Sequence, residues 1–163
     1  MIDSFRGENF YLSNMYPLQY PILTRLHASA ATSEHAYQAA KFSRPDLHYQ
    51  VAGARAAHRA KGEQLDGIAS KNLAHEFIDA GALVVPDWNL IKVGIMQEVV
   101  RRKFIANPDI RMTLAETGDE ELVEGNDWGD LFWGVDHETG EGLNHLGKVL
   151  MEVRTDVQAG KYL

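Results

Sequence analysis

The sequence predicts an α+β fold, predominantly helical, in a single compact domain that covers residues 1–163 and contains a small sheet. Several segments have the apolar periodicity and the capping residues of helices, whereas the strand-like segments are short. Strands and helices do not alternate along the chain as they do in a Rossmann fold. The length of 163 residues suits one domain with its own hydrophobic core.

Two helices in the first half are predicted from their capping residues. Thr32 or Ser33 can cap a helix that runs to about Phe42. Asp46 is placed to cap a second helix that continues to Lys61. The other elements expected in this half are two short strands and a helix that ends at a glycine: 9–20 and 22–29 for the strands, and 72–81 for the helix.

The longest predicted helix covers 88–106, with Asp87 as its cap and Asn107-Pro108 at its end. Its apolar stripe consists of Ile91, Ile95, Met96 and Val99. The remaining expected elements are two short strands and two helices: strands at 120–125 and 131–135, a helix at 108–117, and a C-terminal helix with Leu146, Val149, Leu150, Val153 and Val157 on one face.

The composition is that of a soluble globular protein, with 45% hydrophobic and 24% charged residues. No apolar run approaches the roughly 18 residues that span a bilayer, and the first residues lack the features of a signal peptide. The absence of cysteine excludes disulfides and thiolate zinc sites. We therefore expect a cytoplasmic protein that does not act at a membrane.

The net charge of −7, from 16 basic and 23 acidic residues, argues against broad binding to duplex DNA. It is compatible with a local basic pocket for one or two phosphates. The seven histidines show no spacing typical of metal ligands, and no P-loop or dinucleotide-binding motif is present. We expect neither a metal nor a cofactor.

The segment EGNDWGDLFWGVD, residues 124–136, combines tryptophans, carboxylates and glycines. Trp128 and Trp133 could stack a base, and the interleaved carboxylates of Asp127, Asp130 and Asp136 could transfer protons if they are partly desolvated. The alternative is a tight hairpin with buried tryptophans and capping aspartates. Composition alone favours that alternative, because aromatic residues more often belong to a core than to a site.

A polar stripe lies on the helix expected after Thr32, where Glu34, Tyr37, Gln38 and Lys41 follow at i, i+3, i+4 and i+7. Seven residues of helix separate Glu34 from Lys41 by about 10 Å, on nearly the same bearing. A small ligand fits between two such side chains. For an arbitrary helix, however, a stripe that faces solvent is the more common arrangement.

Five motifs together resemble the NADAR family, which includes the YbiA-like proteins. The resemblance extends from about residue 4 to residue 154. The motifs are, in order, RGENFYLSNMYP, TSEHAYQAAKF, PDWNLIKVGIMQEVVRRKF, TGDEELVEGNDWGDLFWGVD and GLNHLGKVLMEVR.

This resemblance implies a compact, mainly helical α+β domain and an N-glycosidase, a hydrolase that cleaves a bond between ribose and an amine of a base. One branch of the family acts on phosphoribosylamino-pyrimidine intermediates of riboflavin synthesis. Another removes ADP-ribose from guanine and so reverses a modification of DNA. The implied partner is a ribosylated nucleobase or nucleotide, or modified DNA.

The site residues that we expect fall into two groups. The catalytic group is Glu34, Lys41 and Asp130. The substrate-binding group is Asn14, Tyr37, Lys61, Trp88, Trp133 and Asn144. Two positions differ from the family pattern: Asp136 stands where the family varies, and Leu143 where a polar residue is frequent.

Two mechanisms suit these residues. A neutral Lys41 could attack ribose C1′ and form a Schiff base, with Glu34 and Asp130 transferring protons. Alternatively, a carboxylate could activate water for direct attack at C1′. A different class of function, an ADP-ribose-binding or NAD-binding module without hydrolysis, would tolerate the loss of Glu34 or Lys41.

Overall fold

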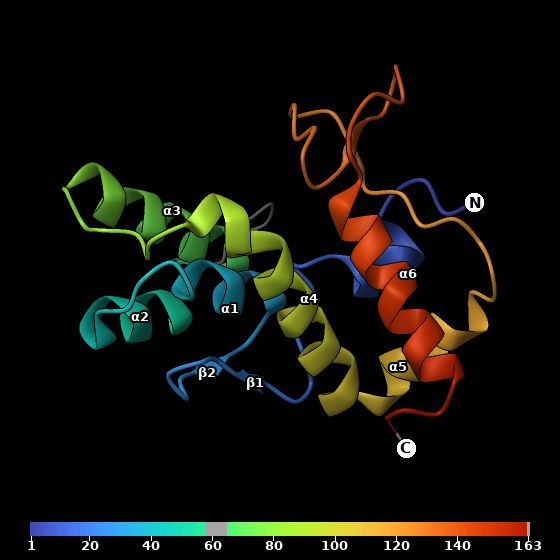
Figure 1. Cartoon of the computed structure of the whole chain (residues 1–163), viewed down its shortest axis with the longest axis horizontal. Coiled ribbons are helices and arrows are strands. Elements are labelled where there is room, and N and C mark those ends of the chain that lie inside the picture. The colour runs from blue at the N-terminus through green and yellow to red at the C-terminus, as the bar shows by residue number, and fades with distance from the viewer. Residues whose placement is uncertain (58–64, 163) are drawn as a thin grey trace. The chain divides into compact units, whose positions relative to one another are not determined.

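The computed structural model of the chain describes residues 1–57 and 65–162. The chain forms two compact units, Asn14–Ala106 and Met1–Ser13 with Asn107–Leu163. In the described part, each unit combines helices with a two-stranded sheet (Figure 1). The predicted fold class, α+β and predominantly helical, is confirmed. The single domain expected over 1–163 stays a prediction.

In the unit of residues 14–106, helix α1 contacts α2, α3 and α4 (Figure 1). The unit also contains an antiparallel pair of two-residue strands, β1 and β2. The bounds are Ile22–Leu23 for β1, Ser29–Ala30 for β2, Ser33–Ala39 for α1, Pro45–Ala52 for α2, Asp66–Asp79 for α3 and Trp88–Ala106 for α4.

Helix α1 begins as predicted, because the Thr32 hydroxyl accepts a hydrogen bond from the backbone N–H of His35 at 3.2 Å. The regular helix ends at Ala39, three residues before the expected Phe42. The last turn tightens there, with the N–H of Lys41 donating to Gln38 O at 3.2 Å. All seven residues of α1 are buried.

Helix α2 departs from the prediction at both ends. It begins at Pro45, whose fixed φ suits the first helical position, so Asp46 lies inside the helix and is not its cap. It ends at Ala52, before Gly53, and does not continue toward Lys61. The backbone leaves the helix there, and Ala54 O lies 2.7 Å from His35 Nε2. The expected helix between 58 and 61 lies outside the described residues.

Helix α3 begins at Asp66, six residues before the expected start at 72. Its buried positions in the first turns are the small residues Gly67, Ser70 and Ala74. Apolar periodicity does not reveal such a face. Together with α1 and α2, α3 surrounds a hydrophobic core that consists of Ala28, Ala39, Phe42, Leu47, Val51, Ala52 and Ala74.

Helix α4 has the predicted bounds, and the Asp87 carbonyl accepts the N–H of Ile91 at 3.1 Å. Three of the four residues in its predicted apolar stripe are buried: Ile95, Met96 and Val99. Ile91 is 37% exposed, so its place in the stripe was wrong. The buried face lies further along the helix and also includes Val100, Lys103 and Phe104.

In the second unit, α5 packs against α6, and β3 pairs in parallel with β4. The bounds are Gly7–Leu12 for the 3₁₀ helix η1, Pro108–Glu116 for α5, Gly125–Asn126 for β3, Val135–Asp136 for β4 and His145–Gln158 for α6. The predicted face of α6 is largely confirmed: Leu146, Val149, Leu150 and Val153 are buried, and Val157 is partly buried.

The strand predictions were mostly wrong in extent. The stretch 9–20 contains the end of η1 and no described strand. The expected strands at 120–125 and 131–135 shrink to β3 and β4, which overlap them at one residue each. Between β3 and β4, the backbone groups form hydrogen bonds with side chains such as those of Asn126 and Asp130, and not with a neighbouring strand.

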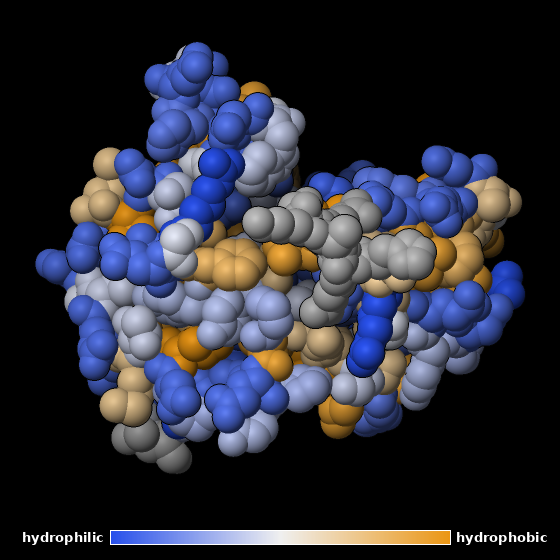
Figure 2. Space-filling view, turned by 180° about the vertical axis from the view of Figure 1, so that it is seen from behind, coloured by the Kyte–Doolittle hydropathy of each residue, from blue (hydrophilic) through white to orange (hydrophobic). Residues whose placement is uncertain are grey.

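The surface mixes hydrophobic and hydrophilic side chains (Figure 2). Several large apolar residues are exposed, among them Leu83 at 86% and Leu90 at 83%. Within residues 1–57 and 65–162, no helix has the length and apolar character needed to cross a membrane.

Candidate active site

The polar stripe of α1 is buried. Glu34 is 8% exposed, Tyr37 6%, Gln38 3% and Lys41, just after the helix, 9%. These values contradict the alternative in which the stripe faces solvent. Because burying a carboxylate and an amine is unfavourable without compensation, their environment decides what they do.

Two aromatic rings flank the amine of Lys41. Its Nζ lies 5.8 Å from the centre of the Tyr37 ring and 5.9 Å from that of Trp88. The two ring centres are 5.2 Å apart, with their planes tilted by 51°. The start of α4 therefore brings Trp88 to the end of α1, which unites three residues that the sequence assigned to the site.

The charge of Lys41 is disfavoured in this environment. Burial lowers the pKa of the Lys41 amine below its usual 10.5, the charge of Glu34 opposes this shift, and Lys71 and Lys92 add to it. The net result increases the fraction of neutral amine at a given pH. A neutral amine has the lone pair that a nucleophile requires.

Several segments of the chain contact Glu34. Gln38 Nε2 donates a hydrogen bond to Glu34 Oε1 at 2.7 Å. The backbone N–H of Glu34 donates to Asn14 O at 3.0 Å, which joins the segment before β1 to the start of α1. Helix α3 approaches the same residue closely, because a Cβ added at Gly67 would lie 3.3 Å from Glu34 Cβ.

Asn14, another predicted binding residue, adjoins this arrangement. It is 9% exposed, and its Nδ2 donates to Met96 Sδ at 3.4 Å. The structure thus brings five predicted residues together in one unit: Asn14, Glu34, Tyr37, Lys41 and Trp88. Lys61, also predicted to bind substrate, lies outside the described residues.

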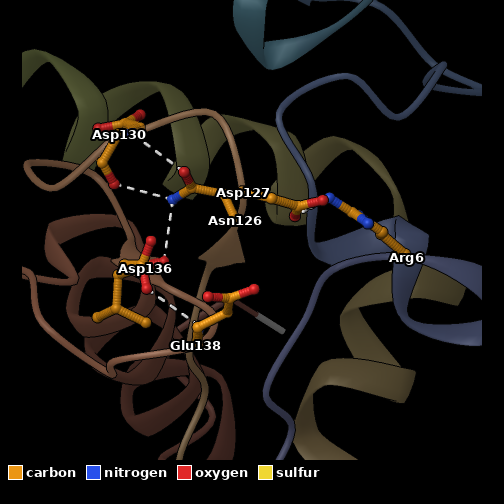
Figure 3. A network of polar contacts seen from close by, with 7 residues as sticks. Arg6, Asn126, Asp127, Asp130, Asp136 and Glu138 are labelled. Carbon is orange, nitrogen blue, oxygen red and sulfur yellow. Dashed lines mark hydrogen bonds and ion pairs between the residues drawn. The ribbon is translucent and has the colours of Figure 1, made fainter.

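Asp130 belongs to the other unit, where its carboxylate binds backbone. Its Oδ1 accepts the N–H of Phe132 at 3.1 Å and that of Trp133 at 2.9 Å. The buried Asn126 side chain bonds both to the N–H and to the C=O of Asp130, at 3.0 and 2.8 Å (Figure 3). These contacts are those of a capping aspartate, and the catalytic role of Asp130 stays a prediction.

Neighbouring residues of this loop bind the chain in the same way. Asp136 Oδ1 accepts the N–H groups of Glu138 and Thr139, and these hydrogen bonds, chiefly those from Thr139, lower the pKa of Asp136. Arg6 pairs with Asp127 at 3.0 Å (Figure 3). Arg6 also lies over the ring of Trp128, which is 60% exposed. Trp128 is thus not one of the buried tryptophans that a plain hairpin would require.

Trp133 and Asn144 complete the predicted residues of this unit. The half-buried Trp133 ring packs edge-on against Phe132, with centres 4.9 Å apart. Asn144 has a left-handed backbone with φ of +51°, and its amide joins two backbone groups: Nδ2 donates to Leu122 O at 2.9 Å, and Oδ1 accepts from Glu124 N at 3.0 Å. Their substrate-binding roles stay predictions.

Sequence reasoning underestimated Gln38 and overlooked two cations. Gln38 was named only as a member of the polar stripe, although its i, i+4 relation to Glu34 is the spacing at which helical side chains meet. Lys71 and Lys92 influence Lys41 from α3 and α4. Lys92 follows Trp88 by one helical turn, a signal that could have been used; Lys71 requires the packing of α3 on α1.

A helix-rich α+β unit that places a buried acid, a buried amine and two aromatic rings at the contact of α1 with α4 defines a candidate enzyme site. The NADAR domain family model matches residues 4–158, and the chain belongs to this family.

Several curated relatives have names that state a function. A Nostoc punctiforme protein named an N-glycosidase is 40% identical over 129 residues, which cover 78% of this chain and 74% of that protein. N-glycosidase YbiA of Shigella flexneri is 31% identical over 130 residues, 80% of this chain and 72% of that protein. A riboflavin biosynthesis protein of Vibrio vulnificus is 35% identical over 148 residues, 91% of this chain but 35% of that protein.

The fold also resembles a solved structure. The NMR structure of the Escherichia coli protein YbiA matches with a TM-score of 0.72 and 26% sequence identity, covering 99% of this chain and 89% of that one. This likeness agrees with the helix-dominated α+β class predicted from the sequence.

Proposed function

We propose that the chain is an N-glycosidase that hydrolyses the bond between ribose C1′ and an exocyclic amine of a nucleobase. Membership of the NADAR family and the N-glycosidase names of relatives support this activity. The observation that carries the proposal is the buried amine of Lys41, flanked by two rings and coupled electrostatically to Glu34.

The reaction begins with opening of the sugar ring. When the ring oxygen takes a proton, the C1′–O4′ bond breaks and C1′ forms an iminium with the base amine. The neutral Lys41 Nζ then adds to C1′. A proton moves from Nζ to the base nitrogen, the bond from C1′ to the base breaks, and the base leaves as its free amine.

The remaining intermediate is a Schiff base between Lys41 and the sugar. Water adds to C1′, the bond from C1′ to Nζ breaks, and the free sugar and the amine are restored. Glu34 carries protons between the ring oxygen, the departing amine and water. Trp88 and Tyr37 hold the planar base or the sugar against Lys41. Asp130 as a second proton carrier stays a prediction.

Direct attack by water is the alternative mechanism. In it Glu34 activates water at an oxocarbenium-like C1′, and Lys41 serves only as a charge. This route requires the carboxylate more than the amine, so Glu34→Gln would be far more damaging than Lys41→Arg. The lowered pKa of Lys41, caused chiefly by burial, favours the covalent route, because a lysine kept only for its charge gains nothing from that shift.

The candidate substrates are ADP-ribosylated guanine in DNA and a phosphoribosylamino-uracil. Both carry phosphate groups, and cations of α3 and α4 adjoin Lys41. The pKa of the exposed His75 is lowered by burial and, to a smaller extent, by the charges of Lys41 and Lys71. The charge of Lys92 likewise lowers the pKa of Lys41. In a chain with a net charge of −7, this local positive potential suits one small phosphorylated ligand better than a long stretch of duplex.

The test is to incubate the protein with each substrate, with and without borohydride. Release of ADP-ribose or of ribose 5-phosphate identifies the substrate branch. Borohydride should add a stable sugar mass to Lys41, located by peptide mass spectrometry. Lys71→Ala serves as the control, since it removes a nearby amine and should keep the adduct at Lys41.

Three outcomes contradict parts of the proposal. Near-normal turnover by Lys41→Ala would exclude the covalent route and favour direct attack by water. Binding of either substrate without release of any base would instead indicate a binding module. Neither binding nor release would remove the proposed activity altogether.

A further inference from the structure

Gln38 occupies an unusual position beside Glu34. Its side chain is 3% exposed, and Nε2 donates to Glu34 Oε1 at 2.7 Å. A carboxylate only accepts hydrogen bonds, so this contact requires the NH₂ group of the amide to face Glu34. The amide oxygen of Gln38 therefore points away from Glu34.

That oxygen is buried and unused. Among the described residues, no hydrogen-bond donor lies in range of Gln38 Oε1, and the same holds for Asn14 Oδ1. Both residues adjoin Glu34, one through its side chain and the other through the backbone bond to Glu34 N. A buried polar atom without a partner costs about 1–3 kcal/mol. Two such acceptors, on residues that both contact Glu34, suit a ligand with several N–H donors.

We propose that Gln38 positions Glu34 and also selects the base, by accepting a hydrogen bond from the ring N–H next to the ribosylated amine. Asn14 Oδ1 accepts the second N–H of the same edge. This inference rests on the proposed N-glycosidase function. The ligand class is a nucleobase in which a ring N–H adjoins the carbon that bears the exocyclic amine.

Both candidate substrates have this arrangement. In guanine the N1–H adjoins C2, which bears the amine, and in the ribosylamino-uracil the N1–H adjoins the carbon that bears the ribosylated nitrogen. A base methylated at that ring nitrogen lacks the donor. The feature recognised by Gln38 is thus common to both substrate branches, and it explains how one site can serve either of them.

The experiment compares each substrate with its analogue methylated at that ring nitrogen, using the wild type and Gln38→Met. The wild type is expected to prefer the unmethylated substrate by about ten- to a hundred-fold in kcat/KM. Gln38→Met, similar in size but without an acceptor oxygen, should reduce this preference to within about threefold. Its kcat should fall for both compounds, because Glu34 loses the hydrogen bond from the Gln38 amide.

Gln38→Glu provides a second variant, with an oxygen where the acceptor stands. It should keep the preference for the unmethylated base, while its kcat falls because the amide donor to Glu34 is lost. Gln50→Met, on the exposed face of α2, is the matched control and should change neither quantity. The melting temperature of each variant shows that it is folded.

The outcomes separate the two proposals. If the wild type releases no base from either substrate, the proposed function fails and this inference fails with it. If the wild type hydrolyses the substrates but does not discriminate, the role of Gln38 is wrong and the N-glycosidase stands. A preference that persists in Gln38→Met overturns the role of Gln38 alone, because it would show that methyl bulk or a bound water decides the selectivity. A preference that is lost in Gln38→Glu also overturns this role, because that variant still has an acceptor oxygen.

Discussion

Two regions of this molecule use the same kinds of side chain in opposite ways. On α1 and just after it, Glu34 and Lys41 are buried, Lys41 lies beside two aromatic rings, and the neighbouring Gln38 keeps an unused amide oxygen. In the loop between β3 and β4, the carboxylate of Asp130 and the amide of Asn126 are occupied by backbone groups. A carboxylate in a conspicuous motif is therefore not by itself a catalytic carboxylate.

The difference follows from what each backbone needs. A helix satisfies its own N–H and C=O groups along most of its length, so its side chains remain available to a ligand. The loop has only a two-residue ladder, and its remaining backbone groups require partners. Side chains such as Asp130 supply those partners.

The largest expected effect tests this comparison directly. Glu34→Gln should reduce kcat by about a hundred- to ten-thousand-fold, because it removes the proton carrier while keeping the size of the side chain. Asp130→Asn should lose much less, because asparagine keeps the oxygen that accepts the N–H groups of Phe132 and Trp133. Steady-state kinetics on the substrate that is turned over, with melting temperatures as the control for folding, measure both. Equal losses would establish the predicted catalytic role of Asp130.

The next effect concerns the stability of the unit formed by Met1–Ser13 and Asn107–Leu163. A Cβ at Gly147 would overlap Leu122 O and the Asn144 amide, so Gly147→Ala should destabilise the protein by about 1–3 kcal/mol or more. Gly94→Ala on α4 is the matched control, because nothing lies within 4 Å of its added Cβ. It should stabilise by up to about 1 kcal/mol. Urea unfolding measures both, and equal changes would show that the Asn144 contacts do not constrain α6.

A smaller effect should appear in the pH dependence of stability. Because the folded-state pKa of Lys41 is lowered, mainly by burial, its protonated form is unfavourable in the folded protein. That penalty is fully present below the folded pKa and disappears as the pH rises to the unfolded value of 10.5. Lys41→Met should therefore raise the melting temperature at neutral pH, with the gain shrinking toward pH 10.5.

The exposed Lys148 is the control for this experiment, and Lys148→Met should change the melting temperature little at any pH. A loss of stability in Lys41→Met at neutral pH would show that Glu34 and the two rings stabilise the charged amine more than burial destabilises it. The same result would weaken the case for a neutral nucleophile.

The smallest effect is expected at the loop surface. Arg6 and Asp127 form an exposed ion pair at 3.0 Å, and Arg6 also lies over Trp128. Arg6→Ala should lower the free energy of unfolding by no more than about 1 kcal/mol and leave kcat unchanged. Added salt should reduce the difference further. A large loss of kcat would instead indicate that this surface takes part in substrate binding.

Local signals predicted the helices best where caps and breakers were present. Thr32 before α1 and Asn107-Pro108 after α4 marked their boundaries correctly, because capping and the conformational limits of proline act within a few residues. The start of α3 was missed, since its buried face consists of Gly67, Ser70 and Ala74. The strands were overestimated, because β pairing depends on partners distant in the chain.

The sequence by itself determined the i, i+4 spacing of Glu34 and Gln38 on one helix with Lys41 just after it, the helix-rich class and the family motifs. Only the tertiary structure decided that this stripe is buried, that Trp88 and Tyr37 flank the amine, and that the Asp130 carboxylate is occupied by backbone. The physical reason is that spacing on a helix is fixed by local geometry. Burial, and with it the pKa of a buried amine, depends on what distant segments pack around it.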